Sequence, residues 1–181
     1  MDLKSILGSV MQNKMSQVIA DKTGLSTAQV NSAIAVGLPM ILAGMAKNAS
    51  ATDGAEALNK ALDRHTDSAV ITNPEAATTT EAETDGSKIL DHVFGSNSGD
   101  VMSAIAEKIG TDKQSVQRLM VILAPIAMAY LARKKQEDKL DADGVSDTLQ
   151  KTEAPEGGSL SGMLDDLTGM FKSVSGSSKS S

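Results

Sequence analysis

The chain repeats part of its own sequence. Residues 17–47 align without a gap with residues 103–133, an offset of 103 − 17 = 86 positions. Each copy predicts a helix, a turn marked by Gly24 or Gly110, and a long apolar helix with Pro39 or Pro125 in its interior. Two such units predict helices packed on helices. The identical pairs are Ile19/Ile105, Ala20/Ala106, Lys22/Lys108, Gly24/Gly110, Val30/Val116, Pro39/Pro125, Ala43/Ala129 and Ala46/Ala132.

Composition supports an all-α fold. Hydrophobic residues make up 40% of the chain but aromatic residues only 2%, so the core must be filled by aliphatic side chains and the ten methionines. No sustained alternation of apolar and polar residues predicts a strand. We therefore expect a multihelical bundle built from two pseudo-repeats, with proline-kinked apolar helices, a flexible acidic linker and a tail.

Charge is distributed unevenly and marks the expected boundaries. The connecting residues 51–100 carry 3 basic and 10 acidic side chains, whereas residues 101–140 carry 7 basic and 4 acidic ones. We predict a helical bundle over residues 1–136, with repeat units 1–50 and 87–136. Between them, residues 51–86 hold a short amphipathic helix followed by a flexible linker from about residue 66. Residues 137–181 are predicted to be a mostly disordered tail with a short amphipathic helix near 160–172.

The turns and prolines suggest how each unit is built. Gly24 and Gly110 lie where a helix C-cap favours a left-handed residue. Ser26 with Gln29, and Thr111 with Gln114, have the spacing of a capping box, although the two pairs differ by one position in register. A proline inside a helix predicts either a kink or a break into two helices.

Neither apolar run predicts a membrane span. Residues 33–46 and 119–132 hold 14 residues each, which at about 1.5 Å per residue is shorter than a hydrocarbon core roughly 30 Å thick. The N-terminal residues lack the pattern of a signal peptide. The chain has no cysteine, which permits a reducing compartment. We expect a cytoplasmic protein without disulfides.

Motifs for catalysis or cofactor binding are missing. There is no phosphate-binding glycine loop, no dinucleotide fingerprint and no nucleophile elbow. The only histidines, His65 and His92, lie near carboxylates, but no recognised metal-ligand spacing includes them. We predict no catalytic residue, no cofactor and no metal site, and interpret both histidines as capping, surface or packing residues.

DNA binding is the alternative function. Segments 17–36 and 103–122 resemble the entry into a helix-turn-helix. However, residues 27–35, which would form the first recognition helix, contain no Lys or Arg for phosphates or guanine edges. The second segment offers Lys113 and Arg118, and the whole chain is acidic with a net charge of −6. We do not expect nucleic acid to be the partner.

Three phrases resemble a bacterial family. ALDRH at 61–65, ILDHVFG at 89–95 and LAPIAMAYLARK at 123–134, with Gly24 and Gly110 in the turns, are similar to the YidB-like group of proteins of unknown function. The resemblance covers roughly residues 1–136. It implies a multihelical bundle and brings no activity, cofactor or catalytic residue.

Together these observations favour a non-enzymatic interaction or scaffolding protein. Its partner is expected to be an unidentified protein or a second copy, bound through a Met-rich helical surface with small residues or through the C-terminal helix. The methionines can equally be explained as core residues. The candidate partner-binding residues of that helix are Leu160, Met163, Leu164, Leu167 and Phe171.

Overall fold

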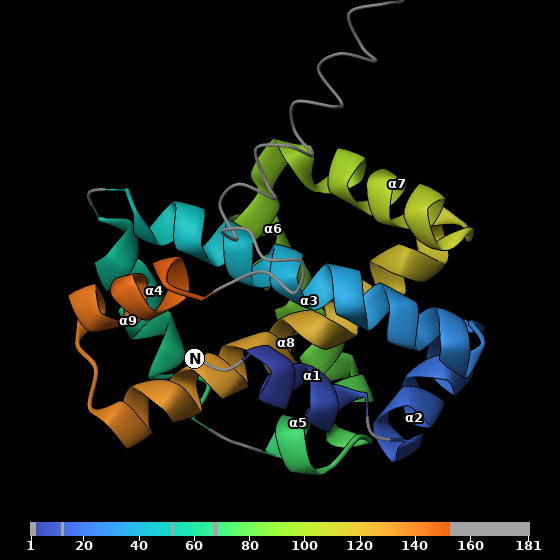
Figure 1. Cartoon of the computed structure of the whole chain (residues 1–181), viewed down its shortest axis with the longest axis horizontal. Helices are drawn as coiled ribbons and strands as arrows, with labels where there is room; N and C mark the ends of the chain where they lie inside the picture. The colour runs from blue at the N-terminus through green and yellow to red at the C-terminus, as the bar shows by residue number, and fades with distance from the viewer. Residues whose placement is uncertain (1–2, 12, 52, 67–68, 153–181) are drawn as a thin grey trace, which may run out of the picture.

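The computed structural model describes residues 3–11, 13–51, 53–66 and 69–152, and over these ranges it is an all-α multihelical fold (Figure 1). Two long helices, α3 and α8, cross the middle of the molecule, and shorter helices surround them. The α-helices are α1 (Leu3–Val10), α2 (Asn13–Thr23), α3 (Thr27–Ala49), α4 (Gly54–Leu62), α5 (Ala69–Thr72), α6 (Thr80–Phe94), α7 (Ser98–Ile109), α8 (Lys113–Asp138) and α9 (Ala142–Gln150). The 3-10 turns are η1 (Ala76–Thr78) and η2 (Gly95–Asn97).

Helices α3 and α8 form the core because most of their side chains are apolar on every face. Leu38, Ile41, Leu119 and Leu123 are fully buried, and the two helices pack against each other. Both helices continue through their prolines. A break into two helices, one of the two sequence-based expectations, is therefore wrong, and the kink stays a prediction.

The length of these helices also corrects the argument against a membrane span. At 23 and 26 residues, α3 and α8 are long and apolar enough to cross a membrane by length and composition alone. Within the fold, 67% of the apolar window of α3 and 72% of that of α8 are buried. Packing in a protein core therefore accounts for their hydropathy.

The two glycine turns have the expected backbone. Gly24 and Gly110 have φ values of 76° and 69°, in the left-handed region that favours glycine. Ser26 caps α3 through the predicted capping box, in which the Gln29 amide donates to Ser26 Oγ at 3.2 Å.

The cap of the second turn differs from the prediction. Asp112 rather than Thr111 caps α8, and its carboxylate accepts from the Ser115 amide at 2.9 Å. At the N-cap, a carboxylate can accept hydrogen bonds from the free backbone amides of the first turn, just as a hydroxyl can. Asp112 lies 112 − 26 = 86 positions after Ser26, so both long helices are capped at equivalent positions of the sequence repeat.

From residue 69 on, the segment predicted to be a flexible linker forms helices and a 3-10 turn, which corrects that expectation. Residues 69–86 form α5, η1 and the first half of α6, with Ala77 and Thr78 buried. Thr79 starts α6 by accepting from the Ala82 amide at 3.2 Å. Few residues of this stretch are buried, which agrees with its low hydropathy.

Gly86 explains why the polar first half of α6 packs closely on α8. A Cβ atom at Gly86 would overlap the carbonyl oxygen of Val121 and lie 3.2 Å from Pro125 Cδ. Val121 is the residue four before Pro125, so its carbonyl is the one that loses its helical N–H partner to the proline. Gly86 therefore lets the α6 backbone reach the place where α8 has a free carbonyl.

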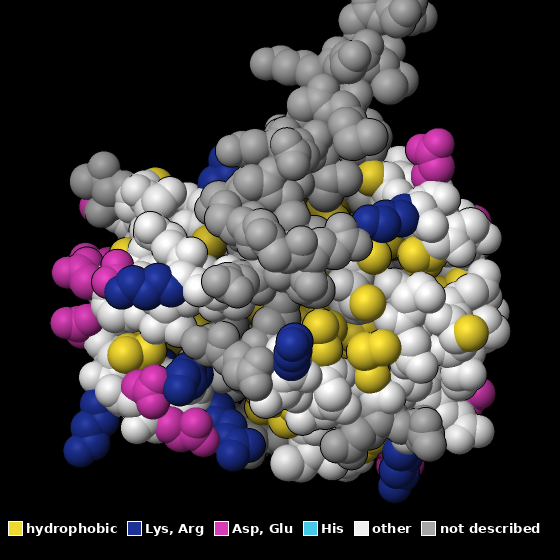
Figure 2. Space-filling view, viewed as in Figure 1, with side chains coloured by type: hydrophobic (Ala, Val, Ile, Leu, Met, Phe, Trp, Pro, Cys, Tyr) yellow, Lys and Arg dark blue, Asp and Glu magenta, His cyan; other side chains and the backbone are white. Residues whose placement is uncertain are grey.

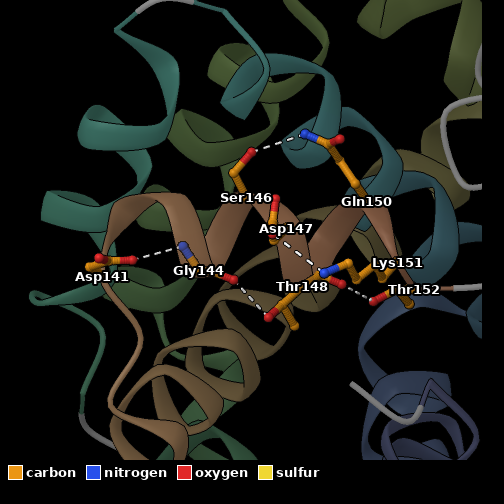
Figure 3. Close-up of polar contacts among 8 residues, drawn as sticks. All are labelled: Asp141, Gly144, Ser146, Asp147, Thr148, Gln150, Lys151 and Thr152. Carbon is orange, nitrogen blue, oxygen red and sulfur yellow. Dashed lines mark hydrogen bonds and ion pairs between the residues drawn. The ribbon is translucent and has the colours of Figure 1, made fainter.

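The tail boundary at residue 136 is also wrong. Helix α8 continues to Asp138, and α9 packs against α3 and α4 with Val145 and Leu149 buried. Polar contacts hold α9 internally (Figure 3): Asp141 accepts from the Gly144 amide at 2.9 Å, and the Thr152 hydroxyl donates to the Thr148 carbonyl at 2.7 Å. The ordered domain thus extends to Thr152. Residues 153–181, with Leu160, Met163, Leu164, Leu167 and Phe171, lie outside the described residues.

The methionines of the described ranges mainly fill the core. Of the seven that the structure describes, six are buried and Met11 is partly buried against them. The six are Met15, Met40, Met45, Met102, Met120 and Met128. Figure 2 shows scattered apolar patches near α1 and α3, whereas charged side chains gather at the end formed by α9 and the C-terminal part of α8.

Candidate functional site

A groove of about 730 Å³ lies between the C-terminal end of α3, helix α4 and helix α6. Its apolar lining comes from these three helices and from Met128 of α8, and its polar lining is mainly basic. The lining residues are Met45, Lys47, Asn48, Ala51, Gly54, Ala57, Leu58, Ala61, Arg64, His65, Asp85, Lys88, Ile89, His92, Val93 and Met128.

Helix α4, one wall of the groove, is fixed at both ends. At its start, a Cβ atom on Gly54 would overlap the Asn48 carbonyl, so the tight connection from α3 requires glycine. At its end, Lys135 of α8 donates to the Asn59 carbonyl at 3.2 Å and forms an ion pair with Asp63. The Lys135 side chain is 14% exposed and that of Asp63 is 63% exposed, so water reaches the ion pair from the carboxylate side.

Asn48 connects the α3 wall to the α6 wall. Its side-chain amide donates to the carbonyl of His92 at 2.8 Å and to that of Val93 at 3.3 Å. These carbonyls belong to the last turn of α6, where no intrahelical donor remains. Gly44 allows the close approach, because a Cβ atom there would overlap Val93 Cγ1. The two walls are thus held at a fixed spacing.

His65 connects α4 to α6. Its Nε2 lies 2.6 Å from Asp85 Oδ2 and its Nδ1 lies 2.9 Å from the Ala61 carbonyl oxygen. The His65 side chain is 18% exposed and that of Asp85 is 45% exposed. Both ring nitrogens therefore already face oxygen acceptors of the protein, and His65 acts as a clamp that holds the end of α4 to α6.

His92 lies on the same groove but makes no comparable contact through its ring. It is exposed in the last turn of α6, where a basic side chain interacts favourably with the helix dipole. Among the residues that the structure describes, no group of three or more His, Cys, Asp or Glu side chains could hold a metal ion. The absence of a metal or cofactor stays a prediction.

The rim of the groove is positively charged, although the chain as a whole is acidic. Lys47, Arg64 and Lys88 line the groove, and none of them forms an ion pair within the described ranges. The one carboxylate of the lining, Asp85, is paired with His65. An apolar floor under unpaired cations is suited to a ligand that combines apolar groups with carboxylates.

The site residues named from the sequence have other roles. Gly24, Gly110, Pro39 and Pro125 shape the turns and the core helices and do not line the groove. Of the groove residues, sequence reasoning singled out only His65 and His92 as chemical candidates. The signal that could have found the rest is the pair of phrases at 61–65 and 89–95, because the fold brings both to this groove.

The segments that resemble a helix-turn-helix do form a helix, a turn and a second helix, but the second helices are α3 and α8. A recognition helix must present one face to the major groove. Val30, Ile34, Val116 and Leu119 of these helices are buried in the core. These residues mark one face of each helix start, whereas Lys113, Gln117 and Arg118 of α8 are exposed. The burial therefore does not decide the DNA-binding alternative, which stays a prediction.

Comparison with known proteins places the chain in a family. A model of the bacterial proteins of unknown function called DUF937 matches residues 5–134, which include the whole groove. Curated proteins and solved structures gave no significant match. The resemblance to the YidB-like group is consistent with the family match. With most of its length matched, the chain belongs to the DUF937 family of bacterial proteins.

Proposed function

We propose that this protein is a non-enzymatic interaction module whose groove between α3, α4 and α6 binds an amphipathic helix with acidic residues. The observation that carries the proposal is the combination of an apolar groove of about 730 Å³ with three unpaired cations on its rim. That volume is within the range of about 300–1,000 Å³ that is usual for small-molecule pockets, so the groove would receive the apolar side chains of the helix and not the whole helix. Helices bind such grooves through apolar side chains at i, i+3, i+4 and i+7.

The hydrogen bonds of the walls support a binding role. Asn48 and the His65–Asp85 pair hold the three helices in place without a ligand. A preformed groove lowers the entropic cost of binding, because little of the protein has to be ordered. Such rigidity suits an interaction module.

The same contacts favour a non-enzymatic role. A general base needs a nitrogen free to take a proton from its substrate, and both nitrogens of His65 face protein oxygens. The described lining contains no Ser, Thr or Cys that His92 could activate. The proposal also keeps a cytoplasmic location, where an acidic peptide of a partner protein or of a second copy is available.

A pair of synthetic peptides tests the proposal. Both carry the same leucine stripe at helical spacing, one with Glu and the other with Lys on its polar face. We expect the Glu peptide to bind more tightly and to shift the NMR amide resonances of Leu58, Ile89 and Val93. Replacing the rim cations by Lys47→Glu, Arg64→Glu and Lys88→Glu should weaken it roughly tenfold, since three exposed pairs contribute about 0.5 kcal/mol each.

A matched control separates the rim from the net charge. The variant Lys14→Glu, Lys108→Glu, Lys113→Glu makes the same change in charge on α2, α7 and α8, away from the groove. It should bind the Glu peptide nearly as well as the unchanged protein. Equal binding of both peptides, or resonance shifts confined to another face, would contradict the proposal.

A further inference from the structure

We propose that residues 160–172, named here the C-terminal segment, occupy this groove in their own chain and compete with a partner helix. The inference rests on the proposed function of the groove and names one occupant of it. The C-terminal segment lies outside the described residues; its sequence, the point where the described chain ends and the charges of the groove support the proposal.

The C-terminal segment has the pattern that the groove requires. Its apolar residues follow helical spacing at i, i+3, i+4, i+7 and i+11. At about 1.5 Å per residue, this stripe would be roughly 18 Å long as a helix. The residues of the stripe are Leu160, Met163, Leu164, Leu167 and Phe171.

The charges of the two surfaces are complementary. At about 100° per residue, Asp165 and Asp166 fall roughly 140° and 120° from the centre of the apolar stripe, one toward each side of the polar face. The only cation of the segment is Lys172 at its end. The groove offers Lys47 on its α3 wall, Arg64 just after α4 and Lys88 on α6, all without an ion pair within the described ranges. In a docked segment the two carboxylates would lie above the apolar stripe, where the long side chains of the rim cations could reach them.

The connection is long enough for the segment to reach its own groove. The described chain ends at Thr152, directly after α9, and α9 packs against α3 and α4, the same two helices that line the groove. Residues 153–159 can span at most about 25 Å when extended. A helix with its side chains is about 10–12 Å across, so the connection can pass around one.

A tethered occupant is an efficient competitor. Connection through a short linker gives an effective concentration in the millimolar range, so even a weakly binding segment fills the groove most of the time. A partner helix must then displace it. Binding by the full chain would be weaker than binding by a chain whose C-terminal segment cannot dock.

Disulfide cross-linking in the full-length protein tests the inference. Because the sequence has no cysteine, only introduced thiols can form a disulfide. One variant carries Ala57→Cys in the groove and Leu164→Cys in the C-terminal segment. A second variant pairs Leu164→Cys with Gln117→Cys, an exposed position of α8 outside the groove. Under mild oxidation we expect an intramolecular disulfide in the first variant and little in the second, as read from migration under non-reducing conditions.

Charge reversal makes the test specific. Adding Asp165→Lys and Asp166→Lys to the first variant should lower the population of the docked state roughly fivefold. Adding Arg64→Glu and Lys88→Glu to that protein should restore the cross-link. In a chain without introduced cysteines, Asp165→Lys with Asp166→Lys should increase the affinity for the Glu peptide.

The outcomes separate this inference from the proposed function. Equal cross-linking in both cysteine variants, or disulfide-linked dimers as the main product, would overturn internal docking. If the Glu peptide still binds the groove while no intramolecular cross-link forms, the groove function stands and the internal occupant is wrong. If neither occurs, both proposals fail.

Discussion

The two sequence units begin with helices that share one apolar pattern but differ in length. In α1, Ile6 and Val10 face the core, and in α6 the equivalent positions Ile89 and Val93 do the same. However, α1 has 8 residues and α6 has 15, because α6 begins within the acidic stretch that precedes its apolar part. The first turns of α6 precede the part that repeats the pattern of α1.

The difference matters because the extra half of α6 helps to build the candidate groove. It carries Asp85, which pairs with His65, and Gly86, which contacts the backbone of α8, with Lys88 of the rim directly after them. The groove is thus lined both by duplicated positions, such as Lys47 and Val93, and by residues such as Asp85 that belong only to the second unit. A polar composition therefore did not mean a lack of structure here.

The largest predicted difference between α6 and α1 is their response to the same substitution, glycine to alanine. Gly86→Ala should destabilise the fold by about 1–3 kcal/mol, because its Cβ atom would overlap the Val121 carbonyl. Gly8→Ala should stabilise it by up to about 1 kcal/mol, since nothing lies within 4 Å of a Cβ atom at that exposed helical position. Urea denaturation followed by circular dichroism measures both changes. A Gly86→Ala protein as stable as the unchanged one would show that α6 does not approach α8 in this way.

The second test concerns the clamp that only the longer helix can form. A double-mutant cycle of His65→Ala and Asp85→Ala should give a coupling free energy of about 1 kcal/mol or less, because the carboxylate is partly exposed to water. The same cycle between His65→Ala and Glu83→Ala, on an exposed α6 position, serves as the control. Coupling of similar size in both cycles would mean that the His65–Asp85 contact does not hold α4 to α6.

Much of the fold could be predicted from sequence because it depends on local patterns. The apolar faces, the left-handed glycines and the Ser26 capping box all follow from residues a few positions apart. The extent of α6 could not be predicted, because the reason for it is a contact between Gly86 and Val121, distant in sequence. The same holds for α9, which is ordered by burial of Val145 and Leu149 against other helices.

The candidate groove was harder to predict for the same reason. Its residues come from α3, α4, α6 and α8, and most are common types such as Ala, Leu and Lys. Only the positions of the two histidines within short phrases gave a local signal. The cations of the rim carry meaning only together, once the helices bring Lys47, Arg64 and Lys88 to one opening.

The smallest effect that we predict concerns the N-caps of the two long helices, which are different residue types at equivalent positions of the two units. Hydrogen bonds from the Ser115 side chain and amide lower the pKa of Asp112 below its ordinary value of 3.8, whereas Ser26 at the matching position does not titrate. A carboxyl with a lowered pKa in the folded state stabilises that state above the pKa of the unfolded chain, and the contribution is lost as the pH falls through the folded value.

We therefore compare the unchanged protein with Asp112→Ser, which gives the second turn the hydroxyl cap of the first. Their melting temperatures should differ most above about pH 5, and the difference should shrink steadily as the pH falls below 3.8. Because the carboxylate is exposed, the effect should be small. The matching change Ser26→Asp should introduce a weaker pH dependence at the first turn, because Gln29 takes the place of Ser115, whose hydroxyl donates to Asp112. A difference between Asp112→Ser and the unchanged protein that stays constant across this range would mean that the carboxylate does not act as a charged cap, and that the two units start their long helices in the same way.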